Sequence, residues 1–163
     1  MIGYRIRQAQ EQDCTEIARL TSQLGYPASS EVMRPRLQRL LNGSSDVVFV
    51  AETDPGSELI GWIQGSLAQY LESDYRVEIA GLIVDEPFRR NGVGRDLITR
   101  VQGWAAERGA VQASVRCRTS RPEAHLFYES LGYTPAKTQI AFRKPLSSDL
   151  NRPAAASPHE PSR

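Results

Sequence analysis

Apolar residues recur along the chain in two spacings, one typical of strands and the other typical of helices. Alternating or continuous short runs predict strands, and apolar positions three or four residues apart predict amphipathic helices. The predicted strands are 4–8, 47–53, 59–69, 76–84, 111–117 and 139–144, the last of them with a short partner near 133–136. The predicted helices are 10–24, 29–42, 92–108 and 122–131.

Glycine and proline separate these elements. Gly25 and Pro27 end the first helix, and the turn Asp54–Ser57 joins two strands into a hairpin. Pro35 falls inside the second helical pattern, so a short or irregular start is expected there. The polar run 70–75 is predicted to be a connection between strands.

The order β-α-α-β-β-β-α-β-α-β predicts an α/β single domain with a mixed central sheet flanked by helices. A chain of 163 residues suits one domain with a sizeable core. We place that domain at residues 1–146. Residues 147–163 are rich in Pro, Ala and Ser and have few large apolar side chains, so a disordered tail is expected.

Composition narrows the class of partner. The formal net charge is +1, so no overall field favours nucleic acid or an anionic membrane. Cys14 and Cys117 lie far apart and lack metal-ligand spacing, which indicates reduced thiols in a cytoplasmic protein and no metal site. The N-terminal stretch has no long apolar core, so no signal peptide is predicted, and no apolar run is long enough to span a bilayer.

The candidate binding motif follows the apolar strand 79–84. The sequence RRNGVG, residues 89–94, leads directly into a helical pattern. Glycines let the backbone approach a ligand, and the N–H groups and dipole of a helix start attract an anion. Arg89, Arg90 and Arg95 add full charges, so the pattern favours a phosphate or pyrophosphate. A tight strand–helix connection without a ligand is the alternative. The motif matches neither the P-loop nor the three-glycine dinucleotide fingerprint.

Two segments carry a resemblance to a known family. Arg89-x-x-Gly92-x-Gly94 resembles the acyl-coenzyme A loop of the GNAT family of N-acetyltransferases, and AHLFYESLGY, residues 124–133, resembles its A-x-x-F-Y-x-x-x-G-F/Y segment. The resemblance covers about residues 4–146. The KTQIAF ending and the AHLFY segment look most similar to the small-molecule branch, which includes aminoglycoside and aminoalkylphosphonate acetyltransferases.

The resemblance implies how the coenzyme is held. In that fold the strands 76–84 and 111–117 are adjacent and parallel and splay apart, and acetyl-coenzyme A, the acyl donor, lies in the opening. The backbone of Leu82, Ile83 and Val84 is implied to pair with the pantetheine arm. The loop is implied to hold the pyrophosphate through Arg89, Arg90, Asn91, Gly92, Val93, Gly94 and Arg95. Arg121 stands where many members have asparagine, and its side chain reaches coenzyme phosphate or the acceptor, or faces water.

The resemblance also implies two catalytic residues. Tyr128 corresponds to the family's proton donor to the departing thiolate, and its alternative is an aromatic packed on the core beside Phe127. Glu78 corresponds to a glutamate that takes the amine proton through water, and its alternative is a strand-end carboxylate that is solvated or paired with Arg76. Alternation places Glu78 on the face of Leu82 unless a bulge intervenes near Gly81. No catalytic role is expected for Cys117.

The predicted function is transfer of an acetyl group from acetyl-coenzyme A to a primary amine by direct attack, with a small-molecule acceptor. Protein acetylation and a non-catalytic acyl-coenzyme A sensor are the alternatives, and Glu78 with Tyr128 argues against a sensor. The acceptor is expected beside the loop 25–30 and the segment 69–75. There Glu72, Asp74 and Tyr75 either attract a cationic amine or form an ordinary polar loop. The acceptor's identity, the choice of acyl group and the existence of a homodimer stay open.

Overall fold

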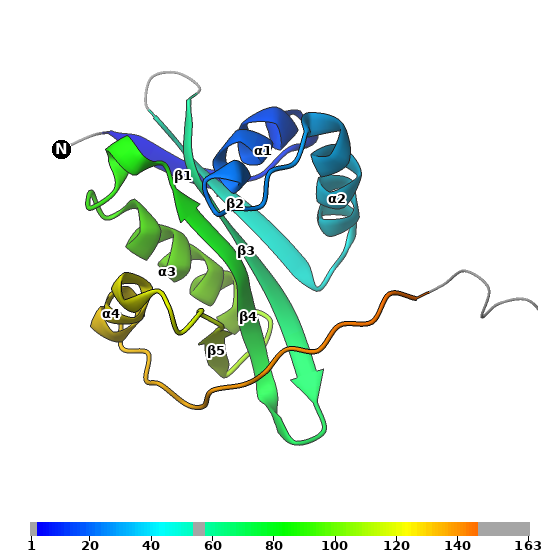
Figure 1. The fold of residues 1–163 in the computed structure, drawn as a ribbon, viewed down its shortest axis with the longest axis vertical. Coiled ribbons are helices and arrows are strands. Elements are labelled where there is room, and N and C mark those ends of the chain that lie inside the picture. The colour runs from blue at the N-terminus through cyan, green and yellow to red at the C-terminus, as the bar shows by residue number, and fades with distance from the viewer. Residues whose placement is uncertain (1–2, 54–57, 147–163) are drawn as a thin grey trace, which may run out of the picture. The chain divides into compact units, whose positions relative to one another are not determined.

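The computed structural model describes residues 3–53 and 58–146. The chain divides into two units, residues 1–133 and 134–163, and each is described by itself. The first unit contains a five-stranded sheet in the order β1-β2-β3-β4-β5 (Figure 1). Its strands are β1 (Tyr4–Gln8), β2 (Asp46–Thr53), β3 (Leu59–Tyr70), β4 (Ser73–Val84) and β5 (Gln112–Val115). Neighbours pair antiparallel except β4 and β5, which pair parallel, so the predicted mixed sheet is confirmed.

Helices cover both faces of this sheet (Figure 1). They are α1 (Cys14–Ser22), α2 (Ser30–Asn42), α3 (Val93–Ala106) and α4 (Pro122–Ser130), with short 3-10 turns η1 (Glu11–Asp13) and η2 (Glu86–Phe88). Leu20, Leu37 and Trp62 belong to one buried core, beneath α1 and α2. Val77 and Leu97 belong to a second core, beneath α3 and α4. The sheet therefore separates two layers, as alternating side chains on a strand require.

The second helix differs from its prediction. Ser29 caps α2 and accepts a hydrogen bond from the N–H of Val32 at 3.4 Å, but the helix then continues through Pro35 without an irregular start. Proline removes only the bond that its own N–H would donate to the carbonyl of Glu31. Both residues are exposed, so water can satisfy that carbonyl. The cost of Pro35 is thus smaller than in a buried helix.

The hairpin β3–β4 is longer than predicted. The run expected as a polar connection contributes Tyr70 to β3 and Ser73–Tyr75 to β4, and the register pairs Tyr70 with Ser73. Polar side chains are compatible with strands at a solvent-exposed sheet end, because the ladder uses backbone groups only. The turn Asp54–Ser57 of the other predicted hairpin lies outside the described residues, while the strands β2 and β3 on either side of it pair as expected.

The predicted final strand is wrong for this structure. Residues 134–146 belong to the second unit and are in neither a helix nor a strand, so the strands expected at 139–144 and near 133–136 are not formed. An apolar alternation becomes a strand only when a neighbour accepts its backbone hydrogen bonds. The described part of the second unit offers no such neighbour. The tail predicted at 147–163 lies outside the described residues, and the boundary at residue 146 stays a prediction.

A buried carboxylate ties α1 to the end of β4. Asp85 is 6% exposed and accepts hydrogen bonds from Arg19 Nη1 and Gln23 Nε2, each at 2.8 Å. Burial opposes its ionisation, but the hydrogen bonds from Gln23 and Arg19 outweigh burial and lower the pKa of Asp85 below its ordinary value. The backbone N–H of Asp85 also donates to the carbonyl of Ile60 at 2.8 Å. These contacts fix the position of Asp85, and therefore the place where the loop before α3 begins.

Candidate functional site

The two parallel strands β4 and β5 pair over a short distance and then part. Among the described residues, β5 accompanies β4 only from Arg76 to Ile79, where Ile79 lies opposite Val115. On the other side, Ile79 pairs with Gly65 of β3 and Gly81 with Gln64, so Ala80 is an extra residue, a bulge. The predicted adjacency and parallel direction of these strands are confirmed, and the pairing ends at Val115, because β5 is shorter than the predicted strand 111–117. We call the backbone of Ala80–Val84, on the side that β5 no longer covers, the open edge.

Only some backbone groups of the open edge face away from β3. Antiparallel pairing directs N–H and C=O groups of alternate residues to opposite sides. Because Asp85 donates to Ile60 of β3, Ile83 two residues earlier also points its backbone to β3, where it lies opposite Trp62. Leu82 and Val84 then point away. Of the three residues expected to pair with pantetheine, the register leaves Leu82 and Val84 in a position to do so.

The bulge also sets which side chains share a face. Val77 and Ile79 lie in the core beneath α3, so Glu78 points to the opposite face, that of α1 and α2. Beyond the bulge, Ile83 lies in the core beneath α1 and α2. Glu78 therefore shares its face with Ile83 and not with Leu82, because the bulge expected near Gly81 is present.

The loop before α3 curls its backbone into an anion-binding shape. Arg90 and Gly92 have left-handed backbone conformations, with φ of 65° and 86°. The first bond of the α3 ladder runs from the N–H of Asp96 to the carbonyl of Gly92, at 3.0 Å. The N–H groups of Val93, Gly94 and Arg95 therefore precede the helical ladder, and they point out of the N-terminus, where the helix dipole is positive. This geometry fits a phosphate or pyrophosphate.

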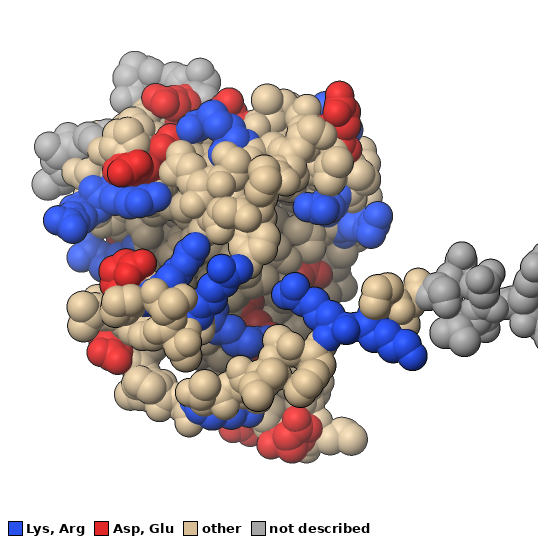
Figure 2. Space-filling view, viewed as in Figure 1, with Lys and Arg blue, Asp and Glu red and all other residues tan. Residues whose placement is uncertain are grey.

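The polar side chains of the loop have different tasks. Arg89 folds back and donates from Nε to the carbonyl of Val84 at 2.9 Å. Asn91 donates to the carbonyls of Phe88 and Arg89 at 3.2 and 3.1 Å, so it holds the loop in shape. Arg90 and Arg95 remain exposed. Figure 2 shows Lys and Arg side chains gathered over the connection between β4 and α3.

Gly94 has a packing role that the sequence did not indicate. A Cβ on Gly94 would lie 3.2 Å from Cζ of Phe127, closer than most side-chain contacts, and 3.6 Å from Cγ2 of Val84. The missing side chain therefore lets α4 approach the start of α3. Gly92 differs, because its constraint is the positive φ that other residues avoid.

Tyr128 lies on α4, beneath the face of the sheet opposite Glu78. Its ring meets those of Phe127 and Tyr133 edge to face, with centroids 5.2 and 5.6 Å apart. Burial is the main cause that raises the pKa of Tyr128 well above its ordinary value, and the neighbouring Cys117 thiol adds to the rise. The phenol is thus protonated throughout the physiological range. Core packing and proton donation are compatible at this position.

Glu78 is held by two arginines. Arg76 Nη2 donates to its Oε1 at 3.0 Å, and Arg116 Nη2 donates to its Oε2 at 2.5 Å. Burial opposes ionisation, but the hydrogen bonds from Arg116 and Arg76 outweigh it and lower the pKa of Glu78. The pairing of Glu78 with Arg76 is the one given as an alternative to a catalytic role. Pairing with Arg116 was missed, because it depends on the register that places Ser114 beside Glu78.

The connection from β5 to α4 reaches the loop between α1 and α2. Arg118 Nη2 donates to Tyr26 Oη at 2.6 Å, and Arg121 Nη2 lies 3.5 Å from the carbonyl of Leu24. Arg121 is thus directed towards this loop. His125 contacts the carbonyl of Arg118 through Nε2 at 2.9 Å, which supports the same connection.

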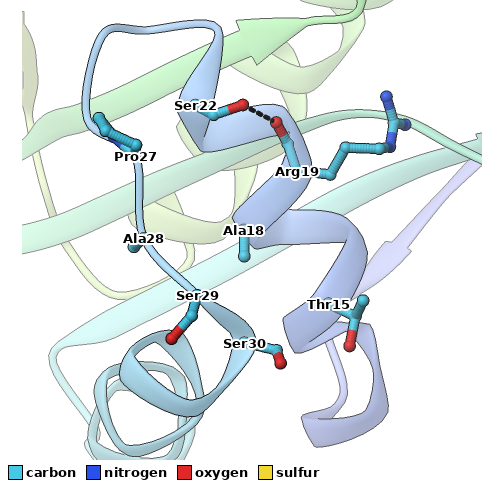
Figure 3. A pocket seen from close by; sticks show the side chains of 8 residues that line it. All are labelled: Thr15, Ala18, Arg19, Ser22, Pro27, Ala28, Ser29 and Ser30. Carbon is cyan, nitrogen blue, oxygen red and sulfur yellow. Dashed lines mark hydrogen bonds between the residues drawn. The ribbon is translucent and has the colours of Figure 1, made fainter.

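The segments expected to line the acceptor carry few fixed contacts. Glu72 and Asp74 are exposed, and Tyr75 is half-buried. A cavity of about 460 Å³ lies between α1 and the segment that enters α2 (Figure 3). Small side chains dominate its lining, and the lining residues are Thr15, Ala18, Arg19, Ser22, Pro27, Ala28, Ser29 and Ser30. Neither Glu78 nor Tyr128 lines it, so the cavity lies beside the loop between α1 and α2 and away from these two candidate residues.

The part of the chain that the structure describes contains no group of three or more His, Cys, Asp or Glu placed to hold a metal ion. None of the helices in the described ranges is both long enough and apolar enough to cross a membrane.

Comparison with known proteins gives consistent matches. The model of the Acetyltransferase (GNAT) family matches residues 4–133. An aminoglycoside N(6')-acetyltransferase type 1 from Stenotrophomonas maltophilia is 26% identical over 145 residues, covering 86% of this chain and 93% of that protein. One from Acinetobacter genomosp. 13 is 22% identical, covering 73% and 84%. The solved structure of aminoglycoside N-acetyltransferase AAC(6')-Iy in complex with CoA has a TM-score of 0.79 at 22% identity, covering 88% of this chain and 96% of that one.

We expect Gly92→Ala to weaken coenzyme A binding about tenfold, because a side chain at positive φ costs about 1–2 kcal/mol and shifts the N–H groups that follow. Gly103→Ala is the matched control in the same helix, since a Cβ there meets nothing within 4 Å. Titration calorimetry with coenzyme A measures both. A folded Gly92→Ala protein with unchanged affinity would contradict the loop's assignment.

Proposed function

The chain belongs to the Acetyltransferase (GNAT) family, and from that premise we propose that it acetylates a small primary amine by direct attack of the amine on the thioester. The enzyme is an acetyl-coenzyme A-dependent N-acetyltransferase. The observation that carries the proposal is the parting of β4 and β5, with Glu78 on one face of the sheet and Tyr128 beneath the other. A proton acceptor and a proton donor on opposite sides are what the reaction needs.

The residues around the open edge would hold the coenzyme. The N–H groups of Val93, Gly94 and Arg95 are arranged to bind the pyrophosphate, with Arg90 and Arg95 as exposed charges. The backbone of Leu82 and Val84 is directed away from β3 and would pair with the pantetheine arm as an added strand does, with the carbonyl of Val84 already accepting a hydrogen bond from Arg89. Bound there, the coenzyme supplies the thioester that is attacked. Holding it against a fixed edge provides most of the orientation that direct attack requires.

Glu78 and Tyr128 would move the protons. Glu78, ionised because Arg116 and Arg76 lower its pKa, accepts the proton of the attacking amine through water. Tyr128, kept protonated by burial, donates to the departing sulfur. Each group is thus already in the protonation state that its task requires at neutral pH.

The relatives suggest a first class of acceptor. Two of them are named aminoglycoside N(6')-acetyltransferases, so aminoglycosides belong in the first set of amines to test.

We further propose a cytoplasmic location, since Cys14 and Cys117 are both free thiols. We also propose that the protein can form a homodimer, which analytical ultracentrifugation would test. Acetylation of a protein amine is the second candidate, and no residue described above favours it.

The test of this function is release of coenzyme A thiol from acetyl-coenzyme A over a panel of aminoglycosides, small amines and peptides. We expect turnover with at least one small amine and none with peptides. Turnover confined to peptides would replace the small molecule by a protein acceptor. Coenzyme binding without turnover across all three groups would instead favour a sensor.

Tyr128→Phe keeps the ring and its packing but removes the proton donor. We expect kcat to fall about 10²-fold with little change in coenzyme affinity. Tyr133→Phe is the matched control, because Tyr133 lies in the same aromatic cluster and its hydroxyl bonds Gln102 at 2.9 Å. Steady-state kinetics on both variants decide the point, and a wild-type kcat in Tyr128→Phe would leave Tyr128 as a packing residue.

Glu78→Gln should show a defect that depends on pH. Because the hydrogen bonds from Arg116 and Arg76 outweigh burial and lower the pKa of Glu78, its carboxylate is ionised at pH 6.5 as well as at pH 9 and can accept a proton at both. Without it, only amine that is already neutral reacts. We expect a loss of about 10²-fold at pH 6.5 that shrinks as pH rises towards the pKa of the amine. The pH profile of kcat/KM measures this, with Glu107→Gln as control. A loss that is equal at every pH would make Glu78 a positioning residue.

A further inference from the structure

Four strands place a row of polar side chains on the face of α1 and α2. Asp46 of β2 lies opposite Ser66 of β3, Ser66 opposite Glu78 of β4, and Glu78 opposite Ser114 of β5. Ser66 Oγ donates to Asp46 Oδ1 at 2.5 Å. The last pair of β4 with β5 is Ile79 with Val115, and Glu78 comes one residue earlier. Of the two carboxylates in the row, Glu78 is therefore the one beside the point where this pairing ends.

The two arginines on Glu78 differ in freedom. Arg76 is 23% exposed in its side chain, and its guanidinium stacks on Tyr70 at 4.7 Å and contacts Ser73 Oγ at 3.3 Å. Arg116 is 76% exposed and donates from one Nη2 to Glu78. A guanidinium has five N–H donors in a planar fork, which suits a carboxylate or a phosphonate. Arg76 is thus fixed by its neighbours, while most donors of Arg116 face solvent.

The charge around Glu78 is therefore positive. One carboxylate is shared by two guanidiniums, and Arg118 and Arg121 follow on the same connection. Asp46 is engaged by Ser66, and Asp74, exposed on β4, lies four residues from Glu78 towards the hairpin turn. A polycation entering here would meet an ionised carboxylate whose charge two arginines already balance, and Arg116 would repel it.

We propose that the acceptor is a small primary amine that also carries an anionic group, and that Arg116 binds this anion beside the amine facing Glu78. The inference rests on the proposed function and names its substrate class. Arg116 is then the residue that selects the acceptor. The ion pair between Arg116 and Glu78 keeps the guanidinium in place before the acceptor arrives, and the exposed donors receive the anion.

The test uses four acceptors with the same aminoethyl group: β-alanine, 2-aminoethylphosphonate, ethanolamine and ethylenediamine. They carry a carboxylate, a phosphonate, a neutral hydroxyl and a second ammonium at the far end. We expect at least one of the two anionic amines to exceed ethanolamine in kcat/KM by about tenfold, the value of one charge-assisted hydrogen bond. Which of the two is preferred separates a carboxylate from a phosphonate. Equal rates for all four, or preference for ethanolamine or ethylenediamine, would overturn the inference while leaving the acetyltransferase intact.

Arg116→Glu provides the second arm. Because Arg116 also holds Glu78, kcat should fall for every acceptor, so the readout is the relative preference: the advantage of the anionic amine over ethanolamine should disappear and ethylenediamine should be favoured, with coenzyme A affinity unchanged. Arg108→Glu, just beyond α3 on the other face, carries the same change of charge and should alter neither. A loss of coenzyme affinity in Arg116→Glu would assign Arg116 to the coenzyme and overturn the proposal.

Failure of the function itself gives a different result. If no amine is acetylated, calorimetric titration of β-alanine and 2-aminoethylphosphonate into the wild-type complex with coenzyme A decides the matter. Binding that Arg116→Ala abolishes supports the anion site although the reaction is wrong. Absence of binding to the wild-type complex rejects the site as well.

Discussion

The structure depends on where β4 stops pairing with β5. The bulge at Ala80 comes directly after the last pair, Ile79 with Val115, so the strand changes neighbours and face at one point. From there the backbone of β4 has β3 on one side and a free edge on the other. A sheet that continued its pairing to Val84 would have no edge to offer a ligand. The loop at Arg90 and Gly92 lies at the end of the same strand, so the anion site and the open edge follow one another along the chain.

This arrangement separates two chemical environments by the thickness of one sheet. Tyr128 lies among aromatic rings, where burial keeps its proton in place. Glu78 lies among arginines, where ion pairs keep its proton away. The pKa values of the two groups are thus moved apart by different physical causes, burial for the phenol and charge for the carboxylate. One fold thereby holds a protonated phenol and an ionised carboxylate at the same pH.

Features that depend on local sequence were predictable, and features that depend on register were not. The glycine that precedes α3 and the order of elements up to α4 follow from local chemistry. The contact of Arg116 with Glu78 joins residues 38 positions apart and requires knowledge of strand alignment. The alternation in 139–144 was a sound local pattern, but a strand also needs a neighbour, which a pattern cannot supply.

The buried contact of Asp85 with Arg19 and Gln23 has an evolutionary consequence. It fastens α1 to the base of the coenzyme loop before the chain reaches Leu24, and α2 begins at Ser30 with its own cap. The intervening residues 24–29 are therefore framed by two independent anchors. Substitutions or changes of length within them can remodel the surface offered to an acceptor without moving the loop at Gly92. Under the proposed function, new acceptor preferences can thus arise in one short segment while the proposed coenzyme site is inherited unchanged.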